Sequence, residues 1–230
     1  MYVPATSTQP LAAVAPLAPA EIVGGSSPSA PSLFTSPPGA AATAHVSLRV
    51  RGLDLNVLAG HPASVAGLLT SRSASVGELA GRVVRLQALT PRGWRTLATD
   101  TAGRRGRFRV RYVPSRIGSR LVRLAVAGAG DQRTARRLLG RLDVYRLAGA
   151  SWYGGGGTLA CGGELTSSTL GVANQTLPCG TQVTLRYDGR TVTVPVIDRG
   201  PYVEGREFDL TEATKRALGF EGTGDVWSTR

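Results

Sequence analysis

From His45 to Arg146, apolar residues alternate with arginines and other polar residues, and this period of two limits the fold more than any other feature. Successive side chains of a β-strand point to opposite faces of a sheet, so the alternation predicts strands with one face in a core and one in water. Turn residues recur roughly every 8 to 12 positions, which is typical of an antiparallel β-sandwich. We predict strands at His45–Arg51, Arg82–Leu89, Gly93–Ala98, Arg105–Val113, Arg120–Ala127 and Arg141–Arg146.

The composition supports a mainly β chain. The 230 residues include 30 glycines and 14 prolines, which are too many for a helical bundle. No segment approaches the roughly 18 consecutive apolar residues of a membrane-spanning helix, so we expect no membrane span. Residues 1–44 are rich in Pro, Ala and Ser and carry one charged residue, Glu21. They bury too little apolar surface to offset the entropy of ordering, so we predict a disordered tether.

Arginines are concentrated in residues 45–147, here named the arginine-rich region. It holds 20 arginines against five acidic residues, in a chain of formal net charge +12. Such a surface attracts nucleic acid, anionic lipid and anionic cell-wall polymers alike. The alternative is a solvated basic face without a partner. His45 and His61 have no second ligand at metal-binding spacing, so we expect no metal site.

The arginine-rich region also resembles the Ig-like modules of bacterial cell-surface proteins. The resemblance rests on the hairpin pattern of Gly93–Ala98 (GWRTLA) followed by Arg105–Val113 (RGRFRVRYV). It implies an Ig-like antiparallel β-sandwich. The region contains no cysteine, so this sandwich would have no disulfide between its sheets.

Residues 148–230, the C-terminal region, predict a small closed β-barrel in outline. Asp188-Gly189 stands between two strand-like runs and is a strong signal for a two-residue hairpin. Thr211 is the expected N-cap of a short helix, and Gly219 is its expected stop. The predicted strands are Ala150–Gly154, Gln182–Tyr187, Arg190–Val196 and Asp225–Thr229, and the predicted helix is Thr211–Leu218.

The same segments resemble a known family. The runs ASWYG, ACGG, STLGVANQTLPCGT, VTVPVIDRGPYVEGREFDLTEAT and ALGF…GDVWST are similar, in this order, to the rare lipoprotein A (RlpA)-like double-psi β-barrel, a fold also used by expansins. The resemblance covers about residues 148–230 and implies a six-stranded double-psi β-barrel with one short helix. Family members that are enzymes are lytic transglycosylases of peptidoglycan, whereas others bind or loosen the cell wall without shown catalysis.

The resemblance places the catalytic role on Asp198, in the VIDRGPY segment. Cleavage of a glycosidic bond needs a carboxylic acid to protonate the leaving oxygen, and one acid/base suffices when the substrate's own 6-hydroxyl captures the cation. Two positions depart from the family pattern. Asn174 stands where members have a histidine, and Gly163 stands where enzymes have a glutamate, with Glu164 next to it as a weaker catalytic candidate. Asparagine cannot carry a proton between pH 5 and 8.

Other roles stay open around this segment. Asp198 alternatively pairs with Arg199 or Arg206 and only stabilises a turn. An inverting glycosidase would need a second acid about 6.5 to 9.5 Å from the first, for which Glu164, Glu204 and Asp209 are available. Trp152 and Trp227 are either sugar-stacking residues or barrel core. We predict substrate contacts from Tyr153, Thr176, Arg199, Tyr202 and Asp209.

Cys161 and Cys179 are the only cysteines in the chain. An even pair without CxxC spacing or a nearby histidine predicts one disulfide rather than a zinc site or a thiol nucleophile. A disulfide indicates an oxidising compartment. Met1–Gln9 contains no lysine or arginine and Pro16 interrupts the next apolar run, so the given start shows no export signal. We expect an extracellular or cell-wall location, with the true start upstream.

Three functions of different classes follow as hypotheses. The first is a peptidoglycan lytic transglycosylase that cleaves MurNAc-GlcNAc bonds with Asp198 as acid/base. The second is a non-catalytic peptidoglycan-binding or expansin-like module. The third, DNA binding through the arginine-rich region, lacks a helix-turn-helix or finger pattern. We expect a monomer without cofactor or metal, with peptidoglycan glycan strands as partner and anionic wall polymers as a second partner of the arginine-rich region.

Overall fold

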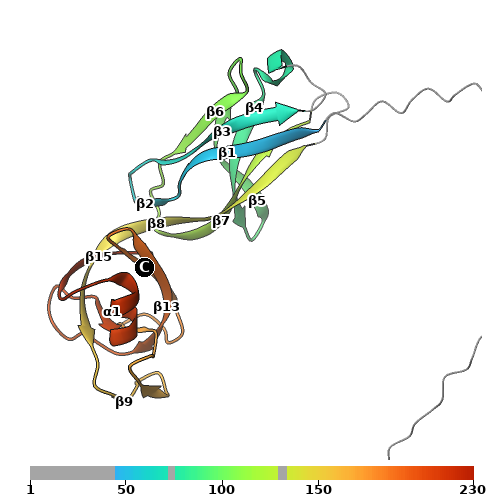
Figure 1. Cartoon of the computed structure of the whole chain (residues 1–230). Coiled ribbons are helices and arrows are strands. Elements are labelled where there is room, and N and C mark those ends of the chain that lie inside the picture. Colours follow the sequence, from blue (N-terminus) through green and yellow to red (C-terminus); the bar gives the residue numbers. More distant parts are fainter. Residues whose placement is uncertain (1–44, 72–75, 129–133) are drawn as a thin grey trace, which may run out of the picture. The chain divides into compact units, whose positions relative to one another are not determined.

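The computed structural model describes residues 45–71, 76–128 and 134–230 (Figure 1). The predicted tether, residues 1–44, lies outside the described residues. Strands dominate, and the described part contains one α-helix, α1 (Glu212–Leu218), besides the 3₁₀ turn η1 (Val76–Leu79). The prediction of a mainly β chain with one short helix is confirmed. Within the described ranges, no helix is both long and apolar enough to cross a membrane.

Two sets of strands in the arginine-rich region share one hydrophobic core. β1, β3 and β6 form a three-stranded antiparallel sheet, while β4, β5, β7 and the first part of β8 form one end of a larger sheet. Side chains from both sets meet in the core, among them Leu69, Phe108, Leu86 and Leu124. The bounds are β1 (Val46–Asp54), β2 (Asn56–Leu58), β3 (Ala63–Ser71), β4 (Val83–Thr90), β5 (Gly93–Thr101), β6 (Arg107–Tyr112) and β7 (Gly118–Val126).

The strand β8 (Ala135–Tyr153) takes part in both the arginine-rich and the C-terminal pairings. Its first part pairs with β7 up to Val144, and its last part pairs with β15 from Arg146 onward. The prediction of two separate strands, 141–146 and 150–154, is wrong, because one strand of 19 residues runs through 141–146 and on to Tyr153. In its last part the strand is paired on both sides, since Ala150 has Phe208 of β14 on one side and Gly224 of β15 on the other.

The strands of the C-terminal region close on themselves. Their order is β14-β11-β13-β12-β15-β8, and β14 also pairs in parallel with β8, which completes a ring (Figure 1). The interior is apolar and includes the fully buried Leu185, Phe208 and Leu210. A two-residue-per-strand hairpin, β9 (Gly157–Thr158) with β10 (Glu164–Leu165), stands apart from the ring pairings. The ring bounds are β11 (Val172–Ala173), β12 (Gln182–Tyr187), β13 (Arg190–Asp198), β14 (Phe208–Thr211) and β15 (Gly224–Ser228).

Local sequence signals set the turns of this region. Asp188 and Gly189 have φ values of 43° and 79°, as a two-residue type I′ hairpin between β12 and β13 requires. The Thr211 hydroxyl accepts a hydrogen bond from the Thr214 N–H (3.3 Å) and so caps α1. Gly219 ends the helix in the left-handed conformation. The predicted hairpin, N-cap and stop are all confirmed.

Gly149 marks the tightest packing in β8. A Cβ at this position would lie 2.0 Å from the Gly205 carbonyl oxygen, and the Gly149 carbonyl already accepts the Glu207 N–H (2.8 Å). We expect Gly149→Ala to lower the free energy of unfolding by about 2 kcal/mol, because backbone must move to admit the methyl group. Urea denaturation measures this, with Gly222→Ala, which meets nothing within 4 Å, as the control. Equal stability of the two variants would contradict the packing argument.

Candidate active site

Four strands of the ring place Asp209 and Ser151 in one row with Ala173 and with Asp198, which stands at one end. In the register of β13, β11, β14 and β8, Asp198 pairs with Ala173, Ala173 with Asp209, and Asp209 with Ser151. The next row, Val172 and Leu210, points into the core. Because side chains alternate along a strand, the row of Asp209 and Ser151 faces away from the core. Two strand spacings put the Asp198 and Asp209 backbones about 10 Å apart.

Asp198 is the last residue of β13 and is half-buried. Its Oδ1 accepts two backbone hydrogen bonds, from Ala160 N–H (2.9 Å) and from Arg199 N–H (2.8 Å). Within the described part of the chain, Oδ2 has no hydrogen-bond partner and the carboxylate makes no ion pair. The alternative in which Asp198 forms an ion pair with Arg199 or Arg206 is therefore not what the structure contains. Backbone N–H groups therefore hold one oxygen of the carboxylate, and the other has no such hydrogen bond.

Tyr153, the last residue of β8, has a buried hydroxyl without a hydrogen-bond partner among the described residues. Burial is the main cause that raises the pKa of Tyr153, and the negative charges of Asp198 and Asp209 raise it further. The hydroxyl thus lies near both carboxylates and interacts with that of Asp198, although no hydrogen bond of normal geometry joins the two. A buried polar atom without a partner is costly, and a catalytic role is one of the reasons for which a protein keeps such an atom.

Asn174 is 8% exposed and is bonded into its own loop. Its Oδ1 accepts the N–H groups of Thr176 (3.0 Å) and Leu177 (2.8 Å), and its Nδ2 donates to the Glu207 carbonyl (2.9 Å). Its backbone N–H donates to the Asp198 carbonyl (3.1 Å). The side chain therefore shapes the loop beside Asp198, and it makes no hydrogen bond to the Asp198 carboxylate.

Arg199 also has structural partners. Its guanidinium donates to the carbonyls of Asn174 and Leu177 (3.0 Å each) and approaches the Cys179 sulfur at 3.0 Å. Arg199 thus fixes the 174–179 loop. Its role in substrate binding stays a prediction, as do those of Thr176 and Tyr202, of which Thr176 is exposed on this loop and Tyr202 is 80% exposed.

The disulfide joins two segments that border Asp198. Cys161 and Cys179 are bonded, with their Cα atoms 5.6 Å apart, so the predicted disulfide is confirmed. Cys161 lies in the turn that contributes the Ala160 N–H, and its own N–H donates to the Ile197 carbonyl (3.2 Å). Glu164 follows this turn in β10 and is exposed. The structure describes no contact between Glu164 and Asp198.

The two tryptophans of the C-terminal region lie at different places. Trp152 is 43% exposed, and the Lys215 ammonium lies 4.1 Å from its ring centroid. Trp227 is half-buried, with its ring 5.7 Å from that of Tyr145. Trp152 is therefore not a core residue, and its exposed ring carries a cation on one face.

Sequence reasoning missed several members of this site. The Ser151 hydroxyl donates to Asp209 Oδ1, and the Arg206 guanidinium reaches the Ser151 oxygen at 3.4 Å. The two-residue spacing of Ser151 and Tyr153 in the predicted strand was the available signal, because both then lie on one face. Ala160 contributes only its backbone N–H, and a backbone donor cannot be recognised from the residue type.

The C-terminal region combines a closed ring of mixed parallel and antiparallel strands with a carboxylate held at the end of one strand, and its sequence is similar to RlpA-like double-psi β-barrels. Residues 147–227 match the family model described as "Lytic transglycolase". The prediction of an RlpA-like double-psi barrel is thus confirmed for this region.

Individual relatives cover the same part of the chain. A "Probable endolytic peptidoglycan transglycosylase RlpA" of Synechocystis is 41% identical over 88 residues, which are 35% of this chain and 27% of that protein. The protein of the same name from Aquifex aeolicus is 43% identical over 82 residues, 34% of this chain and 36% of that protein. The chain therefore spans about a third or less of these relatives. Among solved structures, the "Streptomyces papain inhibitor (SPI)" is 26% identical, with a TM-score of 0.30, and covers 36% of this chain and 91% of that one.

We predict that Tyr153→Phe separates stability from function. Removal of a buried hydroxyl without a partner should raise the free energy of unfolding by about 1 kcal/mol at neutral pH. If the hydroxyl serves the site, activity on glycan should fall by about tenfold. Urea denaturation and product release measure the two effects, and a loss of stability together with activity would show a merely structural tyrosine.

The pH dependence of stability has a definite sign. Burial raises the pKa of Tyr153, and burial likewise raises the pKa of Tyr145 to about 12. Above pH of about 10, unfolded tyrosine ionises while these two stay protonated, so stability should fall as the pH rises. Tyr153→Phe should lessen this loss of stability, because of the two tyrosines with a raised pKa only Tyr145 then remains. An unchanged slope in unfolding measured between pH 9 and pH 11 would contradict the assignment.

Proposed function

We propose that the chain is a peptidoglycan lytic transglycosylase that cleaves MurNAc-GlcNAc bonds with Asp198 as its acid/base. The observation that carries the proposal is the Asp198 carboxylate itself, with Oδ1 held by two backbone N–H groups and Oδ2 free of described partners. The relatives are named endolytic peptidoglycan transglycosylases, which supports the same substrate class.

The reaction follows from one carboxyl group. Protonated Asp198 donates its proton to the glycosidic oxygen as the C–O bond breaks, and an oxocarbenium-like centre develops at the sugar C1. The substrate's own 6-hydroxyl then attacks C1 and forms a 1,6-anhydro ring. Its proton passes to the Asp198 carboxylate, which restores the acid. No water is consumed, and the backbone N–H groups on Oδ1 hold the carboxyl in place throughout.

We propose that Tyr153, Thr176, Arg199, Tyr202 and Asp209 contact the glycan. The Ser151 hydroxyl donates to Asp209 Oδ1, and the Arg206 guanidinium donates to the Ser151 oxygen. Ser151 therefore orients Asp209 directly, and Arg206 does so through Ser151. Tyr202, at 80% exposure, offers an aromatic ring for stacking on a sugar. Glu164 is the alternative candidate for the catalytic acid, because it follows the turn whose Ala160 N–H donates to Asp198.

A binding module without catalysis is the second candidate, and Asn174 favours it. Its polar side-chain atoms all make hydrogen bonds to the backbone of Thr176, Leu177 and Glu207. At the position where the family has a histidine, an asparagine cannot transfer a proton. Such a protein would retain peptidoglycan glycan strands as its ligand and would release no product.

The domain organisation is also a proposal. We propose a tether at 1–44, an Ig-like β-sandwich at 45–147 and a six-stranded double-psi β-barrel at 148–230. The shared core of the two strand sets supports the second, and the ring order β14-β11-β13-β12-β15-β8 supports the third. We further propose a monomer that works outside the cell or in its wall, where the disulfide is stable, and whose arginine-rich region binds anionic wall polymers.

Digestion of purified sacculi tests the proposed activity. The full chain is incubated with sacculi, and the soluble products are analysed by mass for 1,6-anhydro ends. Anhydro products support the transglycosylase, whereas reducing ends would show a hydrolase. Sacculus binding without any product would favour the second candidate.

A further inference from the structure

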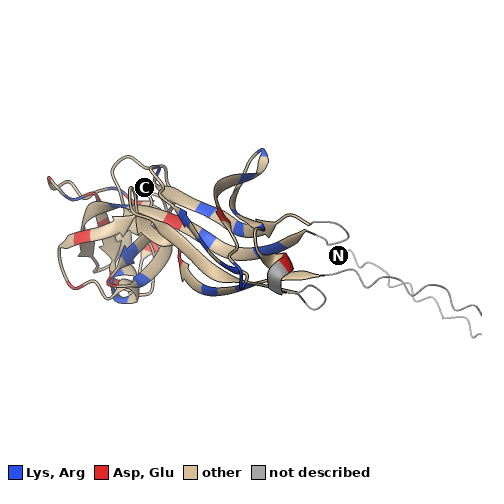
Figure 2. Ribbon diagram, turned by 90° about the horizontal axis from the view of Figure 1, so that it is seen from above, with Lys and Arg blue, Asp and Glu red and all other residues tan. Residues whose placement is uncertain are grey.

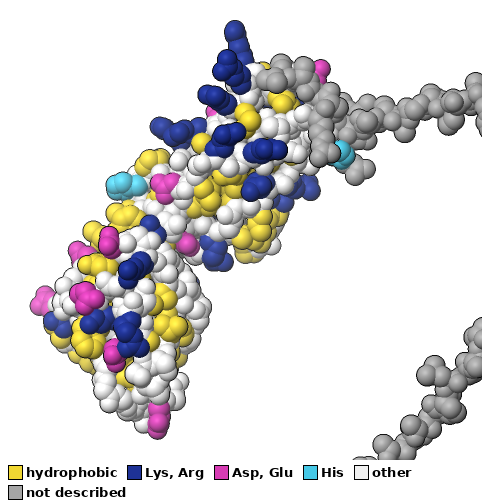
Figure 3. Space-filling view, viewed as in Figure 1, with side chains coloured by type: hydrophobic (Ala, Val, Ile, Leu, Met, Phe, Trp, Pro, Cys, Tyr) yellow, Lys and Arg dark blue, Asp and Glu magenta, His cyan; other side chains and the backbone are white. Residues whose placement is uncertain are grey.

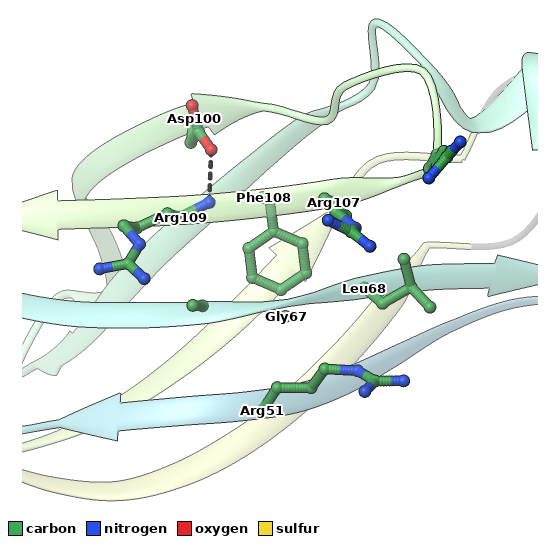
Figure 4. Close-up of a pocket in the computed structure, with 9 residues that line it drawn as sticks. Arg51, Gly67, Leu68, Asp100, Arg107, Phe108 and Arg109 are labelled. Atoms are coloured by element: carbon green, nitrogen blue, oxygen red, sulfur yellow. Dashed lines mark hydrogen bonds between the residues drawn. The ribbon is translucent and has the colours of Figure 1, made fainter.

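One cavity lies far from the barrel in sequence, on the three-stranded sheet of the arginine-rich region. It has a volume of about 870 Å³. Figure 4 shows Arg51 on one strand and Arg107 and Arg109 on another, on either side of Gly67 and Leu68. The lining is completed by Ala66, Asp100, Arg105 and Phe108.

The strand register explains why this surface is a trough. β3 is the middle strand, with β1 on one side and β6 on the other. Ala66 of β3 pairs with Gly52 of β1 and with Arg109 of β6. Because Ala66 and Gly52 have little or no side chain, the sheet surface is recessed at this point. Arg51 lies in the bulge of β1 next to Gly52. With strands about 4.8 Å apart, the arginine walls stand about 10 Å from each other.

The guanidinium groups of this trough lack anionic partners in the described part of the chain. Arg51, Arg105, Arg107 and Arg109 are exposed, and none makes a described side-chain hydrogen bond or ion pair. The one acidic lining residue, Asp100, accepts the backbone N–H of Arg109 (2.6 Å) instead. Four positive charges thus face one negative charge. Figure 2 marks basic residues along the strands of the arginine-rich region, and Figure 3 shows basic side chains on its surface.

We infer that this trough, lined by Arg51, Arg105, Arg107 and Arg109, binds a linear phosphodiester polymer of the poly(glycerol phosphate) kind. The inference rests on the proposal that the arginine-rich region binds anionic wall polymers, and it assigns the site and the ligand chemistry. Arg107 and Arg109 are two positions apart on β6, which spaces them about 7 Å along the strand. An extended polymer along β3 would meet arginines on both sides, each bonding phosphate oxygens with its planar fork.

The lining argues against single-stranded nucleic acid. Binding of unpaired bases relies on exposed aromatic rings for stacking, and the one aromatic residue of the trough, Phe108, is 5% exposed. Its ring packs under the floor, where a Cβ on Gly67 would lie 2.6 Å from it. A polymer with small neutral linkers between phosphates needs no such platform.

Binding of labelled poly(glycerol phosphate) to the full chain tests the site. The triple variant R51Q/R107Q/R109Q is compared with R92Q/R95Q/R137Q, which removes equal charge from exposed arginines outside the trough. We expect the Kd at 0.15 M salt to rise at least tenfold in the first and less than threefold in the second. The slope of log Kd against log salt should fall by about 2 to 3 in the first only. Arg107→Glu, a single exposed change, should weaken binding in the same direction if the triple variant folds poorly.

Each other result would overturn the inference. Equal losses in the two triple variants would show diffuse attraction without a site, although polymer binding by the region would survive. Tighter binding of a single-stranded oligonucleotide of equal charge would make nucleic acid the ligand. Competition by inorganic phosphate at equal phosphate concentration would show a site for single ions. Absence of binding by the wild type would show that the polymer is not a ligand of the chain. Release of anhydro products from sacculi stripped of phosphodiester polymer tests the proposed activity of the barrel independently.

Discussion

Asp198→Asn should abolish 1,6-anhydro product release from sacculi, with a fall in rate of at least 100-fold, while sacculus binding stays within about twofold of the wild type. The amide keeps an oxygen that can accept the Ala160 and Arg199 N–H groups (2.9 and 2.8 Å), so the end of β13 should keep its shape. What the amide lacks is the proton for the glycosidic oxygen. Product analysis by mass and a pull-down with sacculi measure the two properties.

Two control variants make this result specific. Asp225→Asn removes an exposed carboxylate of β15 and should leave product release unchanged. Glu164→Gln should reduce it by less than tenfold if Glu164 is only a neighbour of the site. Product release that survives in Asp198→Asn but is lost in Glu164→Gln would move the acid role to Glu164. Absence of product from the wild type would leave the binding module as the function.

The elements that could be predicted from the sequence are those set by local chemistry. The hairpin at Asp188-Gly189, the cap at Thr211 and the stop at Gly219 each depend on one or two residues and their backbone preferences. The inward alternation of β1 and β6 follows from period two in the same way, whereas the strand β3 was not predicted. β8 was predicted as two strands, because a run of small residues such as Ala148 to Ala150 has no alternation to read.

The site was only partly predictable, because its geometry depends on pairings between distant strands. A family resemblance was enough to select Asp198, but only the register places Asp209 two strands away and Ser151 beside it. The backbone donor at Ala160 has no sequence signal. Arg199 was predicted to contact substrate or to pair with Asp198. Its guanidinium holds the 174–179 loop, which no residue pattern indicated, and it makes no ion pair with Asp198. Long-range contacts of this kind follow from tertiary packing rather than from residue type.

Removal of the disulfide by Cys161→Ser/Cys179→Ser should lower the free energy of unfolding of the barrel by about 3 kcal/mol. The two cysteines are 18 residues apart, and the open loop gains chain entropy in the unfolded state. Activity should also fall, because the bridge ties the turn of Ala160 to the loop that Arg199 holds, and both border Asp198. Urea denaturation followed by tryptophan fluorescence, in a Trp94→Phe background, reports the C-terminal region through Trp152 and Trp227.

Reduction provides the matched control for this variant. The wild type treated with dithiothreitol should lose the same stability, and the double variant should not respond to dithiothreitol at all. A loss of unfolding free energy below about 1 kcal/mol would have one of two meanings. Other contacts would already order the loop between the cysteines in the unfolded state, or the bridge would strain the folded chain. Full stability with lost activity would instead show that the bridge matters only where it positions the Ala160 N–H against Asp198, and the variant would then serve as a test of backbone support for the acid.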